Sequence, residues 1–273
     1  MFVVDIAIDP IIAQVGPLQL AWHGVFTALA VALAVWFGLR LGEQRGMPRE
    51  ALGDVATWGI VGGVVGARLL HVMDHLSVYL ANPVAVLFVW QGGMAVYGAF
   101  LGGIAAALLA ARRAGLAGWT LLDAAAPAMV LGQVVGRLGC LVNGDAWGAP
   151  CSSGAVLCVR YVHPNALLPA DLLGVPTHPY PLYEMAAGAL LLAALHLARR
   201  RLTAPGTLVL VAAVGYAAIR FSLSFFRQET VVVAGLQEAQ VVALAAGVVA
   251  LALLLARGRP TSTAPSAGEG RAG

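Results

Sequence analysis

Long apolar stretches recur along most of the chain, and short polar connections separate them. Each stretch is about 20 residues long, which is enough for one helix to cross the hydrocarbon core of a bilayer. The pattern therefore predicts an all-α integral membrane protein, a bundle of seven transmembrane helices at about residues 17–40, 52–73, 92–111, 120–140, 181–198, 206–226 and 237–256.

The composition supports a membrane protein. Of the 273 residues, 60% are hydrophobic and only 11% are charged, whereas soluble domains carry about a quarter charged residues. A single helical bundle explains the length better than two soluble domains do. We expect one membrane domain over residues 1–259, followed by a disordered tail at 260–273 that is rich in Ser, Thr, Pro and Gly.

All 16 basic residues are arginines, and most of them lie in every second connection. The opposite connections carry only Arg160 and, at the edge of a segment, Arg227. Because arginine is enriched in cytoplasmic loops, this asymmetry predicts an outside N-terminus and a cytoplasmic C-terminus. The chain has no arginine run or aromatic-interleaved basic patch, so nucleic acid is not an expected partner. The arginines assigned to the cytoplasmic side are Arg40, Arg45, Arg49, Arg112, Arg113, Arg199, Arg200, Arg201, Arg257, Arg259 and Arg271.

Residues 142–180 form the one sizeable connection, which the arginine pattern places outside. Cys151 and Cys158 lie within it, in an oxidising setting where a disulfide between them can form. Spacing alone does not establish that bond, and Cys140 is left unpaired in either case.

A polar stretch, Gly136 to Gly148, runs off the end of the fourth apolar segment. It places Arg137, Asn143 and Asp145 within roughly two helical turns of one another, and glycines interrupt it. Such groups are costly in hydrocarbon, so a membrane protein keeps them where something polar docks.

Further costly side chains lie toward the outer ends of the segments. Together the arginines outnumber the carboxylates, which favours a bound phosphate over a bound cation. The sequence shows no nucleotide-binding loop and no metal-ligand spacing, so we expect neither a cofactor nor a metal. The head group of a membrane phospholipid is the natural ligand. These additional side chains are His23, Arg68, Glu184, Arg220 and Arg227.

Two features of the sequence are open to more than one interpretation. Gly92 and Gly93 open the third segment, where paired glycines either present backbone N–H groups to an anion or simply form a tight entry turn. His23 lies about one turn inside the first segment. A lone histidine there is either a hydrogen-bonded packing residue or a functional one.

Four motifs occur in order along the chain: Trp90-Gln91-Gly92-Gly93-Met94; Gly136-Arg137-Leu138-Gly139 with Asn143 and Gly148; His178-Pro179 with Leu182-Tyr183-Glu184; and Gly215-Tyr216 with Arg220 and Phe225-Phe226-Arg227-Gln228. Each motif is weak by itself. In register, and combined with seven apolar segments over about residues 15–257, they resemble the prolipoprotein diacylglyceryl transferases.

The resemblance implies a multi-pass enzyme of the bacterial inner (plasma) membrane. Such an enzyme transfers the diacylglyceryl group of phosphatidylglycerol to the lipobox cysteine thiol of a prolipoprotein signal peptide and releases glycerol phosphate. Its partners are therefore phosphatidylglycerol, the prolipoprotein and the surrounding membrane lipids. The activity is a step of lipoprotein biosynthesis.

The resemblance also implies roles for single residues. Arg137 and Arg220 match the essential arginines of the family, for which we expect phosphate binding and stabilisation of the leaving group. His23 and Tyr97 complete the catalytic set that we expect. The substrate-binding residues that we expect are Arg137, Gly92, Gly93, Asn143, Asp145, Gly148, Glu184 and Arg227.

Several positions depart from the family motifs. Tyr97 replaces a histidine, Cys140 an asparagine and Ser224 a glutamate, while Asp145 stands where the family has glutamate. His23 occupies a position that is commonly tyrosine. Tyrosine, with a pKa of about 10, is a poor base at neutral pH compared with histidine at about 6.5.

Two readings follow from these departures. In the first, His23 and Tyr97 exchange roles, so that His23 is the base for the thiol and Tyr97 hydrogen-bonds the lipid. In the second, the chain is a diverged paralogue that binds phospholipid without transferring it. A transporter is disfavoured, because the chain shows no internal repeat and its polar groups lie near segment ends.

Overall fold

The computed structural model describes residues 2–16, 18–89, 92–227 and 231–257. Within these ranges, seven helices are long and apolar enough to cross a membrane, which confirms the predicted bundle. The tail predicted to be disordered lies outside the described residues. The seven helices are α1 (Trp22–Glu43), α2 (Arg49–Asp74), α4 (Val96–Arg113), α5 (Gly118–Asn143), α6 (Tyr180–Ala198), α7 (Thr207–Leu223) and α8 (Glu238–Arg257).

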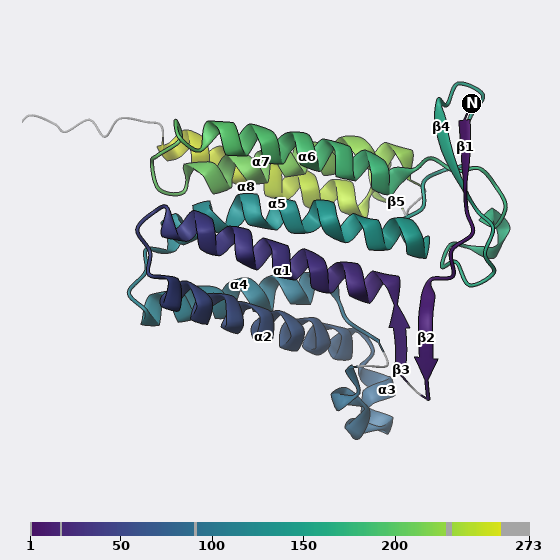
Figure 1. Ribbon diagram of the computed structural model, residues 1–273, viewed down its shortest axis with the longest axis horizontal. Coiled ribbons are helices and arrows are strands. Elements are labelled where there is room, and N and C mark those ends of the chain that lie inside the picture. The colour runs from purple at the N-terminus through teal and green to yellow at the C-terminus, as the bar shows by residue number, and fades with distance from the viewer. Residues whose placement is uncertain (1, 17, 90–91, 228–230, 258–273) are drawn as a thin grey trace, which may run out of the picture.

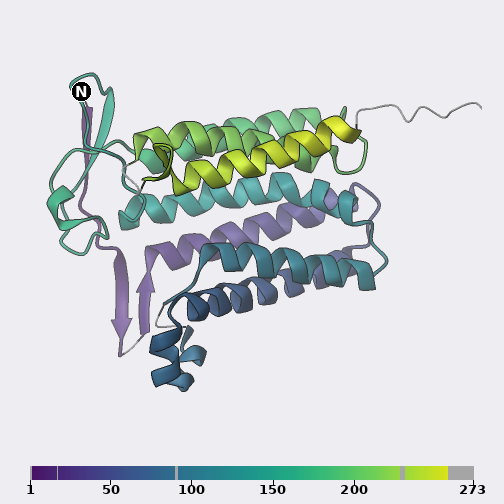
Figure 2. The same cartoon turned by 180° about the vertical axis from the view of Figure 1, so that it is seen from behind.

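The long helices run side by side and fall into two groups (Figures 1 and 2). Helix α5 is central to the larger group, where it packs against α1, α6 and α7, and α8 packs on α7. Helices α2 and α4 form the smaller group. The two groups meet in a buried apolar cluster at one end, which includes Leu41, Leu52, Ala111 and Leu121.

Glycines bring α2 and α4 into close contact. A Cβ atom added at Gly66 would lie 2.3 Å from the carbonyl oxygen of Gly98, and one at Gly62 would lie 2.6 Å from that of Gly102. Small residues at such spacing allow two helix backbones to approach in a membrane. The glycines of α2 and α4 therefore serve helix packing.

Short strands gather at one end of the bundle, which we call the strand end (Figure 1). There β1 pairs in parallel with β4 from the long connection, and β2 forms a hairpin with β3. The sequence analysis did not predict these strands. The elements outside the bundle are β1 (Phe2–Ile6), β2 (Ile11–Val15), β3 (Leu18–Ala21), α3 (Leu76–Ala81), η1 (Pro83–Leu87), β4 (Leu157–Tyr161), η3 (Ala170–Leu172), η4 (Ser224–Phe226), β5 (Val231–Val233) and β6 (Leu236–Gln237).

The long connection is a small folded unit at the strand end. Val159, Tyr161, Leu168 and Leu172 form its apolar core. A disulfide joins Cys151 to Cys158, which confirms the pairing that the sequence left open. The unit lies beside the end of α5, so it covers the residues that follow that helix.

The arginine-rich connections lie at the opposite end of the bundle. Arg40, Arg112 and Arg199 stand at or just beyond the ends of α1, α4 and α6, the helices that run away from the strand end. The connections that are rich in arginine in the sequence thus lie together at one end of the folded bundle.

The close contact of α2 with α4 makes the first prediction. We expect Gly66→Val to lower the free energy of unfolding by about 1–3 kcal/mol, because the added side chain has no room against the α4 backbone. Thermal unfolding in detergent measures the change. Gly53→Val on the same helix is the control, since a Cβ there meets nothing within 4 Å. Equal effects of the two substitutions would contradict the packing argument.

Candidate functional site

The end of α5 supplies the core of the site. Arg137, Cys140 and Asn143 follow one another at three-residue spacing over its last turns, which places them on one side of the helix. Gly144 then ends the helix in the left-handed region, with a φ of 75°. Glycine adopts this conformation readily. The reversal brings Asp145 back beside the helix end, close to Cys140.

Glu184 on α6 holds two arginines together. Its buried carboxylate forms ion pairs with Arg137 from α5 and with Arg220 from α7, the latter at 2.8 Å between Oε1 and Nη1. The Tyr180 hydroxyl accepts a hydrogen bond from Arg220 at 2.6 Å and donates one to Glu184 at 3.2 Å. We call Arg137, Tyr180, Glu184 and Arg220 the arginine cluster.

The arginine cluster carries surplus positive charge. One carboxylate faces two guanidiniums, and the guanidinium carbon of Arg227 lies 5.0 Å from the centre of the Tyr180 ring. The side chains of Arg137 and Arg220 remain 19% and 21% exposed, so a ligand can reach them. Guanidiniums bind phosphate oxygens in pairs of hydrogen bonds, so this cluster suits a phosphate.

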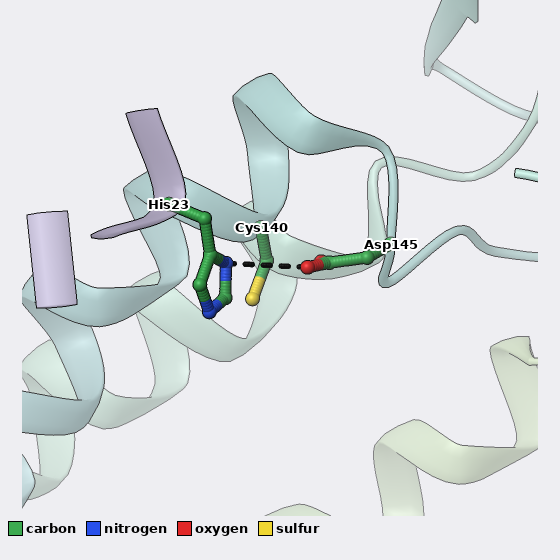
Figure 3. A group of neighbouring side chains, drawn as sticks. All are labelled: His23, Cys140 and Asp145. Carbon is green, nitrogen blue, oxygen red and sulfur yellow. Dashed lines mark ion pairs between the residues drawn. The ribbon is translucent and has the colours of Figure 1, made fainter. Parts of the chain in front are cut away.

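A second group, which we call the His23 cluster, consists of His23, Cys140 and Asp145 (Figure 3). His23 Nδ1, at the start of α1, lies 3.2 Å from Asp145 Oδ2. The Cys140 thiol lies beside both side chains, and the three donor atoms are within 4.8 Å of one another. Asn143 Nδ2 donates a hydrogen bond of 3.2 Å to Asp145 Oδ2.

The charge of Asp145 is stabilised by its neighbours. Burial by itself raises the pKa of this carboxyl, but the imidazole of His23 and the amide of Asn143 lower it to a net value below that of a free aspartate. Asp145 is therefore a carboxylate at neutral pH, and its Oδ2 accepts the hydrogen bond from Asn143.

Arg137 joins the two clusters. Its Nη1 donates to Cys140 Sγ at 3.5 Å, while its Nε pairs with Glu184. A continuous polar network thus runs from His23 to Arg220 and draws on α1, α5, α6 and α7. The structure brings together most of the site residues that the sequence predicted, namely His23, Arg137, Asn143, Asp145, Glu184 and Arg220, with Arg227 over Tyr180.

Gly92 and Gly93 have a clear structural role. Both adopt positive φ, 87° and 73°, and their carbonyl oxygens accept hydrogen bonds of 2.7 and 2.9 Å from Arg68. Arg68 also donates to the carbonyls of Val86 and Ala85, so this buried guanidinium fastens the segment before α4. The tight-turn interpretation accounts for the glycines, and an anion-binding role for them stays a prediction.

Gly148 is required by close packing. A Cβ at this position would lie 2.4 Å from the carbonyl oxygen of His178, which precedes α6. The glycine therefore lets the chain after α5 pass against the start of α6. Its expected role in substrate binding stays a prediction.

Tyr97 lies apart from the polar network. Its side chain is half exposed, and its hydroxyl makes no hydrogen bond with another described residue. The structure therefore joins Tyr97 to His23 through no contact within the described ranges. His23 has Asp145 as its partner, and the exchange of roles between His23 and Tyr97 stays a prediction.

An apolar cleft of about 720 Å³ separates the two helix groups. Side chains of α1, α2, α4 and α5 line it, and His23 lies at its strand end. Val31 and Gly59 are among its lining residues nearer the middle of the bundle. Among the described residues of the two clusters, His23 is the one that lines the cleft.

Tyr180 is a site residue that the sequence analysis missed. It stands four positions before Glu184 on α6, and side chains at that spacing lie on the same helix face. The four-residue spacing to Glu184 is the sequence signal that indicates Tyr180 as a neighbour of that carboxylate. Cys140 was noted only as a departure from the family motif, and its contact with His23 and Asp145 depends on the fold.

These features define a class. The chain is a polytopic membrane protein whose bundle gathers guanidiniums, a histidine and a thiol near one end, and His23 also lines an apolar cleft. Comparison with known proteins then identifies the family.

The family model described as prolipoprotein diacylglyceryl transferase matches residues 10–256. Three relatives, each named phosphatidylglycerol–prolipoprotein diacylglyceryl transferase, are similar over most of their length. The protein of a Nostoc species is 32% identical over 261 residues, which cover 92% of this chain and 91% of the relative. The Thermosynechococcus vestitus protein is 34% identical over 85% of this chain and 87% of its own length. An Azoarcus protein is 34% identical over 90% of this chain and 94% of its own length. The chain therefore belongs to the prolipoprotein diacylglyceryl transferase family.

The second prediction concerns the arginine cluster. Glu184→Ala leaves two partly buried guanidiniums without their carboxylate, and we expect it to lower the free energy of unfolding by about 3–5 kcal/mol. The control is Glu43→Ala, which breaks the solvent-exposed pair with Arg49 and should cost at most about 1 kcal/mol. Thermal unfolding in detergent compares the two. If the Glu184 variant is as stable as the control, the carboxylate is not what holds α5, α6 and α7 together.

Proposed function

We propose that this chain transfers the diacylglyceryl group of phosphatidylglycerol to prolipoproteins, with the lipobox cysteine thiol as acceptor. The observation that carries the proposal is the arginine cluster, in which one buried carboxylate holds two guanidiniums near the strand end of the bundle. Membership of the transferase family supports the same reaction.

The arginine cluster suits the leaving group. In the transfer, the bond between the glyceryl carbon and its phosphate oxygen breaks, and glycerol phosphate departs with the electron pair. Negative charge then grows on the phosphate. Arg137 and Arg220 are already oriented by Glu184 and Tyr180, so they can stabilise that charge without reorganising. Arg227, over the Tyr180 ring, adds a further guanidinium on the same side.

We place removal of the thiol proton at the His23 cluster. The nucleophile must be a thiolate, so the thiol has to lose its proton at the site. His23 is accessible, with 42% of its side chain exposed, and its ring is held beside Asp145. Tyr97 has no polar partner within the described ranges to make it a base, and we assign it a contact with the lipid instead.

The remaining predicted residues have supporting roles in this proposal. Asn143 fixes Asp145, and Glu184 fixes the arginines. Gly148 shapes the wall of the site, and Gly92 and Gly93 shape the entry to α4. The apolar cleft takes the acyl chains of the lipid.

The strand end faces outward in this proposal, and the arginine-rich end faces the cytoplasm of a bacterial cell, in its inner membrane. Arginines concentrated at one end favour this orientation. The Cys151–Cys158 disulfide at the strand end favours it too, because disulfides persist on the oxidising side of a membrane. The signal peptide of the prolipoprotein would then meet the site from the outer part of the bilayer.

The third prediction tests the function directly. With phosphatidylglycerol and a lipobox peptide in detergent, we expect thioether product from the wild type. The rate should fall about 10²- to 10³-fold in Arg137→Ala, which loses charge at the leaving phosphate. It should fall about 10²- to 10⁴-fold in His23→Phe, which loses a side chain of the cluster where we place removal of the thiol proton. Mass spectrometry of the peptide measures the product.

Arg160→Ala is the matched control for loss of an arginine. Arg160, in the folded unit at the strand end, pairs with Asp5 and, within the described residues, bonds to no member of either cluster, so its variant should transfer normally. Full activity in His23→Phe would remove His23 from the reaction. A wild type that binds phosphatidylglycerol through Arg137 but yields no product would favour the non-transferring paralogue.

A further inference from the structure

We propose that His23, Cys140 and Asp145 bind a divalent cation of the zinc type, and that the open coordination position takes the thiol of the acceptor cysteine. The first part concerns this chain alone. The second part rests on the proposed function and says how the thiol is ionised.

The donor atoms match a zinc site in kind and position. Imidazole nitrogen, thiolate sulfur and carboxylate oxygen are the three ligand types that zinc takes from proteins. Nδ1 and Oδ2 lie 3.2 Å apart, and no pair among the three donor atoms exceeds 4.8 Å (Figure 3). With zinc bonds of about 2.0–2.3 Å, ligand atoms of a tetrahedral site lie about 3.3–3.8 Å apart. Small side-chain movements therefore complete the geometry.

Acceptor atoms in the cluster lack hydrogen-bond partners among the described residues. His23 Nδ1 and Asp145 Oδ1 are buried without such a bond, and so is Asn143 Oδ1. The contact of Nδ1 with Oδ2 is short, but it is not directed as a hydrogen bond. Buried polar atoms in folded proteins are normally satisfied. A cation satisfies several acceptors at once, since each offers it a lone pair.

The surroundings support the ligands. Asn143 Nδ2 donates to Asp145 Oδ2, which orients the carboxylate as outer hydrogen bonds do in metal sites. Arg137 Nη1 donates to Cys140 Sγ at 3.5 Å, which holds the sulfur in position. The Asp145 carboxylate and Cys140, once it binds the metal as a thiolate, bring two negative charges to a divalent ion.

The number of ligands points to a reactive site rather than a structural one. Structural zinc sites use four protein ligands, whereas catalytic sites use three and keep one position open. The cluster supplies three, and the exposed part of His23 lies at the end of the apolar cleft. The open position therefore faces the region where lipid and peptide meet.

The same residues are departures from the family motifs. His23 stands where tyrosine is common, Cys140 where asparagine is usual, and Asp145 where glutamate is usual. No spacing in the sequence links these changes, because His23 is far from Cys140 and Asp145 along the chain. The fold brings all three to one point, while the histidine position of the third segment has become Tyr97. A single change of chemistry, from a free base to a metal, explains these departures together.

The transfer then balances as follows. The acceptor thiol coordinates the cation as a thiolate, and its proton passes to water, since a coordinated thiol is deprotonated at neutral pH. The sulfur attacks the glyceryl carbon and forms a carbon–sulfur bond. The carbon–oxygen bond to phosphate breaks, and glycerol phosphate leaves with the electron pair beside Arg137 and Arg220. His23 acts here as a ligand, so no free imidazole is needed.

The test of the metal site uses Co²⁺ as a probe of the purified full chain in detergent. The wild type should bind one equivalent of Co²⁺ and show the sulfur-to-cobalt charge-transfer absorption. No reductant is added, so Cys151 and Cys158 stay in their disulfide and Cys140 is the free thiol. Cys140→Ser should abolish the charge-transfer band. His23→Gln and Asp145→Asn should each weaken binding more than about 100-fold, and Asn143→Ala about 10- to 100-fold as a supporting residue.

His75→Gln is the matched control, because His75 is an exposed histidine that stacks on His71 at the end of α2 and lies outside the cluster. It should bind Co²⁺ like the wild type. Each variant is first shown to unfold at the wild-type temperature. Absence of a Cys140-dependent band in the folded wild type would overturn the metal site, whatever the transferase activity proves to be.

The role of the open position has its own test. Adding a lipobox peptide should strengthen the charge-transfer absorption, because a second sulfur joins the cation, and the same peptide with serine in place of cysteine should leave the spectrum unchanged. Removal of metal by a chelator should lower transfer at least about 100-fold, and Zn²⁺ should restore it. A chain that binds Co²⁺ through Cys140 but transfers equally well after chelation would overturn the catalytic part.

Discussion

One buried carboxylate holding two guanidiniums is the interaction on which the site depends. Glu184 draws Arg137 of α5 and Arg220 of α7 toward α6, so three helices that share little polar surface meet at one point. A carboxylate in such surroundings is tolerated only with partners, and here it has two. The excess charge cannot be matched within the cluster, which makes an anionic ligand the natural third component.

Arg68 shows why residue type alone does not identify such a site. It is more deeply buried than Arg137 and Arg220, and five backbone carbonyls between residues 85 and 93 accept hydrogen bonds from its guanidinium. Its donors are satisfied by the chain itself, so it fastens a turn. Arg137 and Arg220 instead form ion pairs with a single carboxylate that they share, and both side chains remain partly exposed, so a ligand can reach them. The difference lies in the partners, which only the fold reveals.

The sequence predicts what depends on segment length and on the cost of charge in hydrocarbon. The seven spans, the arginine distribution and the importance of Arg137, Glu184 and Arg220 follow from those two quantities. The pairing of β1 with β4 does not, because two five-residue strands far apart in the chain carry no local signal for one another. The same holds for the His23 cluster. His23 is at the start of α1, whereas Cys140 and Asp145 lie at and just after the end of α5, so no motif spacing joins His23 to the other two.

The position of Arg137 explains why the two clusters belong to one site. Its guanidinium contacts both Cys140 and Glu184, so the His23 cluster and the arginine cluster lie side by side. A displacement at carbon requires the attacking sulfur and the departing oxygen on opposite faces of that carbon, held in line. In the transfer that we propose, a glyceryl carbon between the two clusters meets this requirement. The clusters are neighbours because Arg137 and Cys140 lie three residues apart near the end of α5, on one side of the helix.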